Sequence, residues 1–192
     1  MVKNTRATPR MPSAERREQI LDIAHAIVAA EGFHAATLNR IAAEAGVSRT
    51  VIYQQVGDLA ALFVALVDRE LDRAAEQFAA AVATNGGSAK NFVDVFSALL
   101  VAVDSAPETW RLFLFPPEGA PQALYERLAE AENAVRGFFV AGLRAVDPHL
   151  PDLEYSARIL SAVGRELLQL RLADPEHATH ERLLALVKRF ER

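Results

Sequence analysis

The segment Thr37–Val56, which reads TLNRIAAEAGVSRTVIYQQV, constrains the fold more than any other part of this 192-residue chain. Its first half places apolar side chains at the spacing of one helix face: Leu38, Ile41, Ala42 and Ala45. Thr37 precedes them, where a side-chain oxygen can cap the first turn. The pattern predicts a short amphipathic helix that begins after Thr37.

The next residues predict a tight turn into a second helix. Gly46 stands where a helix commonly ends in a left-handed residue, a conformation that glycine adopts without steric cost. Val47 can fill the corner, and Ser48 is a good N-cap for a helix over 49–55. Two short helices joined in this way are typical of a DNA-binding helix-turn-helix.

The second helix divides into an apolar and a polar face. Ile52 and Val51 are expected to be buried, and the opposite face presents Arg49, Thr50, Tyr53 and Gln54. A guanidinium, a hydroxyl, a phenol and an amide are suited to reading base edges in a DNA groove. We therefore expect this face to bind DNA.

This part of the chain resembles the N-terminal domain of the TetR family of bacterial transcriptional regulators. The resemblance covers roughly residues 13–63 and rests on Gly32, Phe33, Thr37, Ile41, Ala42, Ala45, Gly46, Val47, Ser48, Tyr53, Leu62 and Phe63. It implies a sequence-specific regulator, which we expect to be a repressor that binds a palindromic operator in double-stranded DNA as a homodimer. It also implies a small apolar effector that binds the C-terminal domain, tilts the helix after Asp58 and releases the operator.

The chain departs from the family pattern at two places. The family usually has His-Phe where this chain has Gln55 and Val56, and a phosphate-binding Lys where it has Leu59. One phosphate anchor is therefore missing. The residues that we expect at the DNA interface are Thr37, Asn39, Arg49, Thr50, Tyr53, Gln54 and Gln55.

The net charge of −4 is distributed unevenly along the chain. Residues 1–63 carry seven basic and six acidic side chains, and the remainder carries 14 basic and 19 acidic ones. Five basic residues and one acidic residue lie within the first 17 positions, next to the helix-turn-helix that needs them for phosphate binding. We expect residues 1–12 to be a basic arm, which can be disordered alone and ordered on DNA.

Helical periodicity continues through the chain, and no segment shows the two-residue alternation of a strand. Helices are expected over 14–31, 59–84, 89–105, 107–115, 120–146, 152–173 and 176–190, with Ser13 and Asp58 as caps of the first two. We therefore expect an all-α protein. It comprises a flexible arm (1–12), a helix-turn-helix domain (13–63) and a helical-bundle domain for ligand binding and dimerisation (64–192), with the helix over 59–84 as the mechanical link.

Composition excludes several classes of protein. The absence of cysteine excludes disulfides, thiolate metal sites and cysteine catalysis. No run approaches the ~18 apolar residues of a membrane span, and the basic N-terminus has no apolar stretch behind it. We expect a soluble, cytoplasmic protein with no membrane partner and no cofactor.

Aromatic residues are concentrated in the middle helices, where an effector pocket is the natural hypothesis, although each of them can equally be core. Polar residues within apolar faces add to the hypothesis, because burying them without partners is costly. The residues that we expect at the pocket are Phe96, Trp110, Phe113, Arg136, Phe139, Glu166 and Gln169.

The last two helices are more apolar than one buried face requires. They can be the central helices of a monomeric bundle, or each chain can contribute both to a four-helix dimer interface. We favour the dimer, as the family resemblance does, with Leu160, Leu167, Leu184 and Val187 at the interface.

The alternative function is a helical-bundle enzyme or a protein-binding adaptor. Glu31 and His34 have the Glu-x-x-His spacing of di-iron bundles, but Gly32 breaks the helix that would present them. A second group, His177 and His180 with Asp174 and Glu181, is more consistent with helix capping than with a metal site. No phosphate-binding glycine loop, nucleophile elbow or zinc motif is present, so we expect no metal and no catalytic residue.

Overall fold

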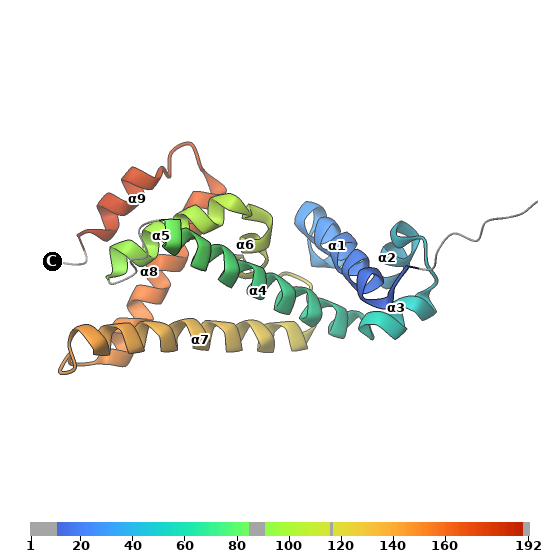
Figure 1. Ribbon diagram of the computed structural model, residues 1–192, viewed down its shortest axis with the longest axis horizontal. Helices are drawn as coiled ribbons and strands as arrows, with labels where there is room; N and C mark the ends of the chain where they lie inside the picture. The colour runs from blue at the N-terminus through green and yellow to red at the C-terminus, as the bar shows by residue number, and fades with distance from the viewer. Residues whose placement is uncertain (1–10, 85–90, 116, 190–192) are drawn as a thin grey trace, which may run out of the picture. The chain divides into compact units, whose positions relative to one another are not determined.

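A computed structural model of the chain describes residues 11–84, 91–115 and 117–189. Within these ranges all regular secondary structure is helical, which confirms the all-α prediction: nine α-helices and one short 3-10 helix, η1 (Figure 1). The chain forms two compact units, Met1–Leu66 and Val67–Arg192. Each unit is described by itself.

The first unit packs α1 (Ser13–Glu31), η1 (Phe33–Ala35), α2 (Leu38–Ala45) and α3 (Arg49–Val56) around one apolar core. Ile20, Ile41 and Ile52 are completely buried and come from α1, α2 and α3 respectively. The rings of Phe33 and Phe63 meet edge to face with their centroids 5.1 Å apart. Each of the three helices therefore contributes a buried aliphatic side chain to the core of this unit.

The cap of α1 differs from the prediction. Pro12 is its N-cap, and Ser13 makes no capping hydrogen bond; its hydroxyl donates instead to the Gln55 side chain, 2.9 Å away. Leu21 is buried and Ile23 only half-buried, so Leu21 and not Ile23 belongs to the buried stripe of α1. Helical spacing alone does not fix which of two neighbouring apolar side chains faces the core.

The long helix α4 (Leu59–Thr84) has the predicted bounds, and Asp58 caps it by accepting a hydrogen bond from the Ala61 amide at 2.8 Å. Its most buried stripe includes Phe63, Val67, Ala74 and Ala81. Leu59, Leu71, Phe78 and Val82 continue its apolar pattern in the sequence but are only half-buried. Within the described ranges no single helix is long and apolar enough to cross a membrane, and α3 with α4 reaches that length and composition only across a 52° bend.

The stripe of α4 is interrupted by a charged residue, Glu70, which is completely buried. Arg69 and Arg73 lie 2.9 and 2.8 Å from its Oε1 atom, and the hydroxyl of Thr109 donates to Oε2 at 2.6 Å. A buried carboxylate is tolerated when cations and hydrogen-bond donors surround it. Removing one donor is costly, because the charge stays behind without a partner. Glu70 therefore fixes α4 to the helix that carries Thr109.

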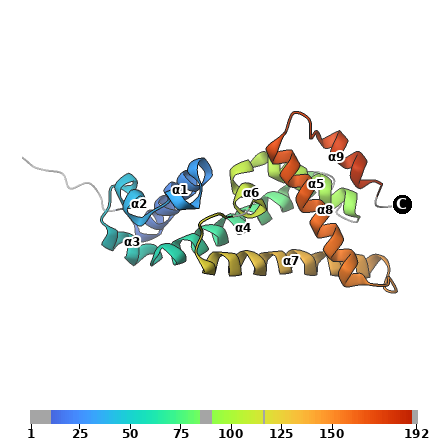
Figure 2. The same ribbon diagram turned by 180° about the vertical axis from the view of Figure 1, so that it is seen from behind.

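The second unit contains the rest of α4 and five further helices: α5 (Phe92–Ser105), α6 (Pro107–Leu114), α7 (Gln122–Val146), α8 (Leu153–Ala173) and α9 (His180–Val187). Helix α8 packs on α5, α6 and α7, and α9 packs on α5, as both views show (Figures 1 and 2). The predicted start of α5 at residue 89 lies outside the described residues. The last helix begins at His180, later than predicted, because Thr179 caps it by accepting a hydrogen bond from the Arg182 amide.

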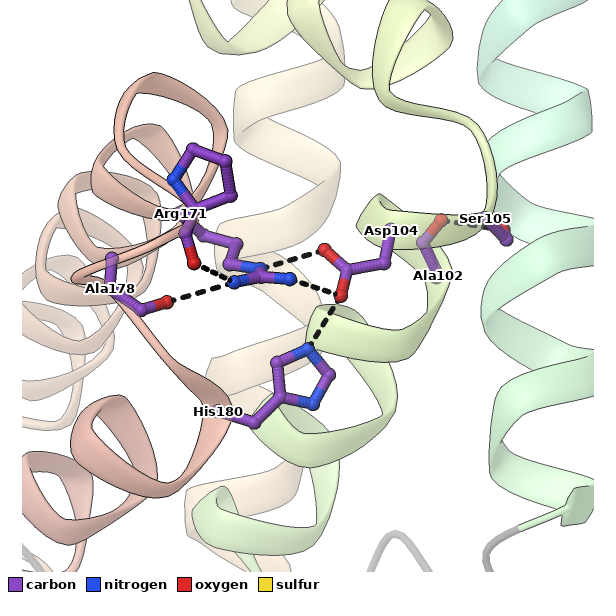
Figure 3. Close-up of polar contacts among 7 residues, drawn as sticks. Ala102, Asp104, Ser105, Arg171, Ala178 and His180 are labelled. Carbon is purple, nitrogen blue, oxygen red and sulfur yellow. Dashed lines mark hydrogen bonds and ion pairs between the residues drawn. The ribbon is translucent and has the colours of Figure 1, made fainter.

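A cluster of charged side chains joins α5, α8 and the start of α9 (Figure 3). Arg171 donates two hydrogen bonds to Asp104, at 2.8 and 2.7 Å, and a further one to the carbonyl oxygen of Pro175 at 2.7 Å. The His180 ring nitrogen Nε2 lies 2.8 Å from the Asp104 carboxylate. One carboxylate of α5 thus connects this helix to α8 and α9, through residues that lie 67 and 76 positions later in the sequence.

The environment of Asp104 changes its acidity. Partial burial by itself raises the pKa of the carboxyl, but the hydrogen bonds and positive charges of Arg171 and His180 outweigh burial and lower the pKa below its ordinary value. A carboxyl whose pKa is lower in the folded state stabilises the fold above its unfolded-state pKa of about 3.9. That stabilisation disappears as the pH falls through the folded-state pKa.

We predict that Asp104→Asn lowers the free energy of unfolding at pH 7 by roughly 1–2 kcal/mol, because two charge-assisted hydrogen bonds are lost from a partly exposed site. The measurement is urea unfolding followed by circular dichroism. The deficit should shrink as the pH falls below the unfolded-state pKa of about 3.9 and through the lower folded-state pKa, because the wild-type carboxyl then takes up its own proton. Asp72→Asn, at an exposed position of α4, is the matched control. An equal effect of both substitutions would contradict the role of the cluster.

Candidate nucleic-acid interface

The connection between α2 and α3 has the predicted geometry. The Thr37 hydroxyl accepts a hydrogen bond from the Arg40 amide at 3.3 Å, and the Ser48 hydroxyl accepts one from the Val51 amide at 3.4 Å. Gly46 ends α2 with φ 63° and ψ 34°, in the left-handed region. Its amide bonds the carbonyl oxygens of Ala42 and Ala43, so the helix end is satisfied within the turn.

Helix α3 presents the predicted polar face. Ile52 is completely buried, Val56 is buried and Val51 half-buried, whereas Arg49, Thr50, Tyr53 and Gln54 are exposed. Tyr53 keeps 47% of its surface exposed, which is unusual for a large aromatic side chain. Its hydroxyl accepts a hydrogen bond from Arg49 Nη2 at 3.2 Å, and the Arg49 guanidinium carbon lies 5.8 Å from the ring centroid.

The remaining predicted interface residues differ in how exposed their side chains are and in whether these side chains already have hydrogen-bond partners. Asn39 is exposed. Thr37 is exposed too, but its hydroxyl already caps α2. Gln55 is half-buried: its side chain accepts from Ser13, and its backbone oxygen accepts from Arg17 Nη1 at 2.9 Å. Gln55 therefore joins the end of α3 to α1, a contact between residues 42 and 38 positions apart that periodicity does not reveal.

The electrostatics of this unit are changed by Arg40. Its guanidinium pairs with Glu31 at 2.6 Å and with Glu44 at 2.9 Å. The hydrogen bonds with these two carboxylates raise the pKa of Arg40, and the hydrogen bond from Arg40 lowers the pKa of Glu31. The charge count from sequence includes Arg40 among the basic residues, and the structure shows that two carboxylates pair with it. Most of the predicted basic arm, residues 1–10, lies outside the described residues.

The residues predicted for an effector pocket do not lie together. Phe96, Trp110 and Phe139 are buried in the second unit, with Phe113 packed against Trp110 at 5.3 Å between ring centroids. The Trp110 indole donates to Gln77 at 3.0 Å. Gln169 donates to the backbone oxygen of Leu114, at the end of α6. Arg136 and Glu166 instead line an open cavity of about 360 Å³ between α7 and α8, together with Glu132, Arg158, Ser161, Ala162 and Arg165.

The residues predicted for the dimer interface are largely used inside the subunit. Leu167 and Val187 are buried in its core, and Leu160 and Leu184 are half-buried. The large apolar side chains that α7 and α8 do expose are Tyr125, Val135, Phe138, Val146, Tyr155, Ile159 and Leu170. The sequence did not distinguish these two groups, because α8 is apolar on more than one face.

The residues considered as metal ligands have other partners. Glu31 pairs with Arg40, His177 lies 2.9 Å from Asp174, and His180 bonds Asp104. In the part of the chain that the structure describes, no three His, Cys, Asp or Glu side chains are arranged to hold a metal ion.

Comparison with known proteins gives results that agree with this geometry. Residues 20–66 match the model of the family described as "Bacterial regulatory proteins, tetR family". The chain is 40% identical over 63 residues to the HTH-type transcriptional activator FasR of Mycolicibacterium smegmatis, a match that covers 33% of this chain and 29% of FasR.

The fold of the whole chain is similar to that of solved regulators. A TetR-like transcriptional regulator from Rhodococcus sp. RHA1 has a TM-score of 0.70 and 24% identity, with 94% of this chain and 97% of that one covered. A putative transcriptional regulator from Pseudomonas aeruginosa PAO1 has a TM-score of 0.73 and 21% identity, with 93% and 89% covered. Residues 20–66 therefore match the tetR family of bacterial regulatory proteins, and the chain as a whole has the fold of a solved TetR-like regulator.

Proposed function

We propose that this chain is a homodimeric, effector-responsive repressor that acts in the cytoplasm and reads operator DNA with α3. The observation that carries the proposal is the exposed polar face of α3, backed by a completely buried Ile52 and entered through the turn at Gly46. In this proposal residues 13–63 bind DNA, and residues 64–192 bind the effector and the second subunit.

The side chains of α3 have distinct proposed roles. Arg49 supplies two parallel donors, which match the O6 and N7 acceptors of guanine. Its contact with Tyr53 holds the guanidinium on the outer face of the helix before DNA arrives. Thr50 and Gln54 are proposed to contact neighbouring base edges, and Asn39 a phosphate.

Two predicted contacts acquire positioning roles in this proposal. Thr37 caps α2, and Gln55 connects α3 to Ser13 and Arg17 of α1. Both contacts are proposed to hold α3 in its orientation within the first unit. Their substitution is therefore expected to weaken binding by disturbing the helix that carries Arg49, in addition to any direct contact with DNA.

The direction of regulation has a second candidate. FasR, which is 40% identical to this chain over 63 residues, is named an activator. A bound dimer that overlaps a promoter blocks transcription. A dimer bound upstream of the promoter can activate transcription. Repression remains the proposal, and reporter expression from the natural upstream region with and without the chain separates the two.

We predict that Arg49→Ala and Tyr53→Ala leave the fold intact, because both side chains point away from the core. Arg49→Ala should weaken binding to the operator by roughly 1–3 kcal/mol if the guanidinium reads a guanine edge. Fluorescence anisotropy with a labelled operator and with a scrambled duplex measures this.

Arg144→Ala, an exposed arginine near the end of α7, is the matched control and should bind as the wild type does. An equal loss on the operator and on the scrambled duplex would make Arg49 a phosphate contact. Unchanged operator binding by the Arg49/Tyr53 double variant would refute the proposed role of α3.

The effector part of the proposal rests on the aromatic interior of the second unit. Ring contacts there link Phe92 to Phe96 and Phe139, at 6.2 and 5.8 Å between centroids, and Trp110 to Phe113. Solved proteins of similar fold include SmeT with triclosan, at 21% identity, and a putative regulator from Saccharomonospora viridis with choline, at 18% identity. We propose a small apolar molecule as the effector of this chain.

Trp110, the single tryptophan, makes this testable. Triclosan and other apolar aromatics should shift or quench its emission, because its buried indole lies against Phe113 and is bonded to Gln77. Linkage requires that an effector which releases the operator bind more weakly when operator is present, by the same factor. Release of the operator with no change in Trp110 emission would move the pocket away from this cluster.

The enzyme alternative has no support in this fold, since regulators of this family are not enzymes. A protein-binding adaptor would expose an apolar surface in place of the polar face of α3. Retention of the chain on operator DNA but not on scrambled DNA at moderate salt would exclude the adaptor reading.

A further inference from the structure

A polar cavity of about 360 Å³ opens between α7 and α8, which pack against each other in the second unit (Figures 1 and 2). Its volume is within the range of small-molecule binding sites. Five charged side chains line it, three of them arginines and two of them glutamates. None of the lining residues is aromatic, so the cavity does not belong to the cluster around Trp110. Here we call it the polar cavity.

The charges that line the polar cavity are only partly paired. Arg165 pairs with Glu132 at 2.5 Å, and Arg136 donates a hydrogen bond to Asn133 at 2.6 Å. Within the described residues, the side chains of Arg158 and Glu166 have no hydrogen-bond or ion-pair partner. The cavity therefore presents one cation and one anion that are both available to a ligand.

The hydroxyl of Ser161, which also lines the cavity, is a further unsatisfied group. Its oxygen is buried and has no hydrogen-bond partner among the described residues. A buried hydroxyl without a partner is costly, and native proteins keep few of them. Ser161 follows Arg158 by three residues, so the two side chains are neighbours on one face of α8. Rotation about its Cα–Cβ bond can turn the hydroxyl towards a group that Arg158 binds.

We propose that the polar cavity binds a small zwitterion with a carboxylate at one end and an ammonium group at the other. Arg158 and the hydroxyl of Ser161 donate to the carboxylate, and Glu166 pairs with the ammonium group. Arg158 and Glu166 lie eight residues apart, which is about 12 Å along the helix axis. The two charged ends of the ligand are therefore separated by several carbon atoms.

The two free charges favour a zwitterion over an ion of one sign. A simple anion would meet the carboxylate of Glu166, which has no partner of its own. A simple cation would meet the guanidinium groups of Arg136 and Arg158. Like charges oppose binding, whereas opposite charges at matching positions favour it. This site goes beyond the proposed function, whose apolar effector is assigned to the aromatic interior.

Isothermal titration calorimetry with the full chain at low salt tests which charges the ligand needs, because charges are then least screened. The probe is 6-aminohexanoate, with 4-aminobutanoate and 8-aminooctanoate as homologues of different length. Hexanoate and hexylamine keep the six-carbon chain and carry only one charge each. We expect saturable binding of at least one of the three amino acids. Both singly charged probes should bind at least about ten-fold more weakly, because each lacks one charge-assisted contact.

Substitutions of the two free charges test where the probe binds. Arg158→Gln and Glu166→Gln should each weaken binding of the best amino acid by about ten-fold or more. Arg144→Gln and Glu154→Gln remove the same charges at exposed positions outside the cavity and should bind as the wild type does. Sedimentation velocity should give one association state for the wild type and all four variants.

Ser161→Ala separates a binding role of the hydroxyl from a structural one. It should weaken binding of the amino acid by a few-fold, because one hydrogen bond to the carboxylate is lost. In urea unfolding without ligand, the variant should be at least as stable as the wild type, since the hydroxyl has no partner to lose. A loss of stability with unchanged binding would overturn the role of Ser161.

Each contrary outcome overturns a defined part of the inference. Absence of saturable binding by all three amino acids at millimolar concentrations overturns the ligand site. Binding that neither Arg158→Gln nor Glu166→Gln weakens overturns its location, and hexanoate binding as tightly as 6-aminohexanoate overturns the pairing with Glu166. A changed association state in these two variants but not in the controls would mean that the charges pair between subunits, which also overturns the ligand site. The proposed binding of operator DNA and of an apolar effector is independent of these results.

Discussion

The left-handed backbone at Gly46 is the constraint on which the DNA-binding unit depends. At φ 63° it reverses the chain between α2 and α3 within three residues, and no atom lies within 4 Å of where a side chain would begin. Glycine is therefore favoured by backbone conformation rather than by lack of space. The caps at Thr37 and Ser48 are formed on either side of this turn. With the turn in place, Ile41 and Ile52 reach one core and Arg49 faces outward.

Local signals made the first unit largely predictable. Helix periodicity and the capping residues identified α2, α3 and the start of α4, and these are features of neighbouring positions in the chain. The errors concern partners that are distant in sequence. Ser13 was expected to cap α1, but its hydroxyl bonds Gln55, 42 positions away. Which hydrogen-bond partner such a side chain has is decided by the folded structure and cannot be read from neighbouring positions.

The second unit was less predictable for the same reason. Glu70 lies in the middle of an otherwise apolar stripe and is stabilised by Thr109, 39 residues away. Asp104 depends on Arg171 and His180, which are 67 and 76 residues away. Helix α8 has apolar side chains on several faces, so its sequence did not show that Leu167 packs inside while Ile159 stays exposed. Burial is decided by the neighbouring helices and not by the helix itself.

The cluster of Glu31, Arg40 and Glu44 has a consequence for how ions affect DNA binding. Each phosphate that a protein neutralises releases counterions, and the logarithm of affinity falls with the logarithm of salt concentration in proportion to the number of such phosphates. A guanidinium already balanced by two carboxylates releases few counterions, and Leu59 contributes no cation at the start of α4. In the proposed complex with DNA, Arg40 and the start of α4 therefore add little to the salt dependence of binding.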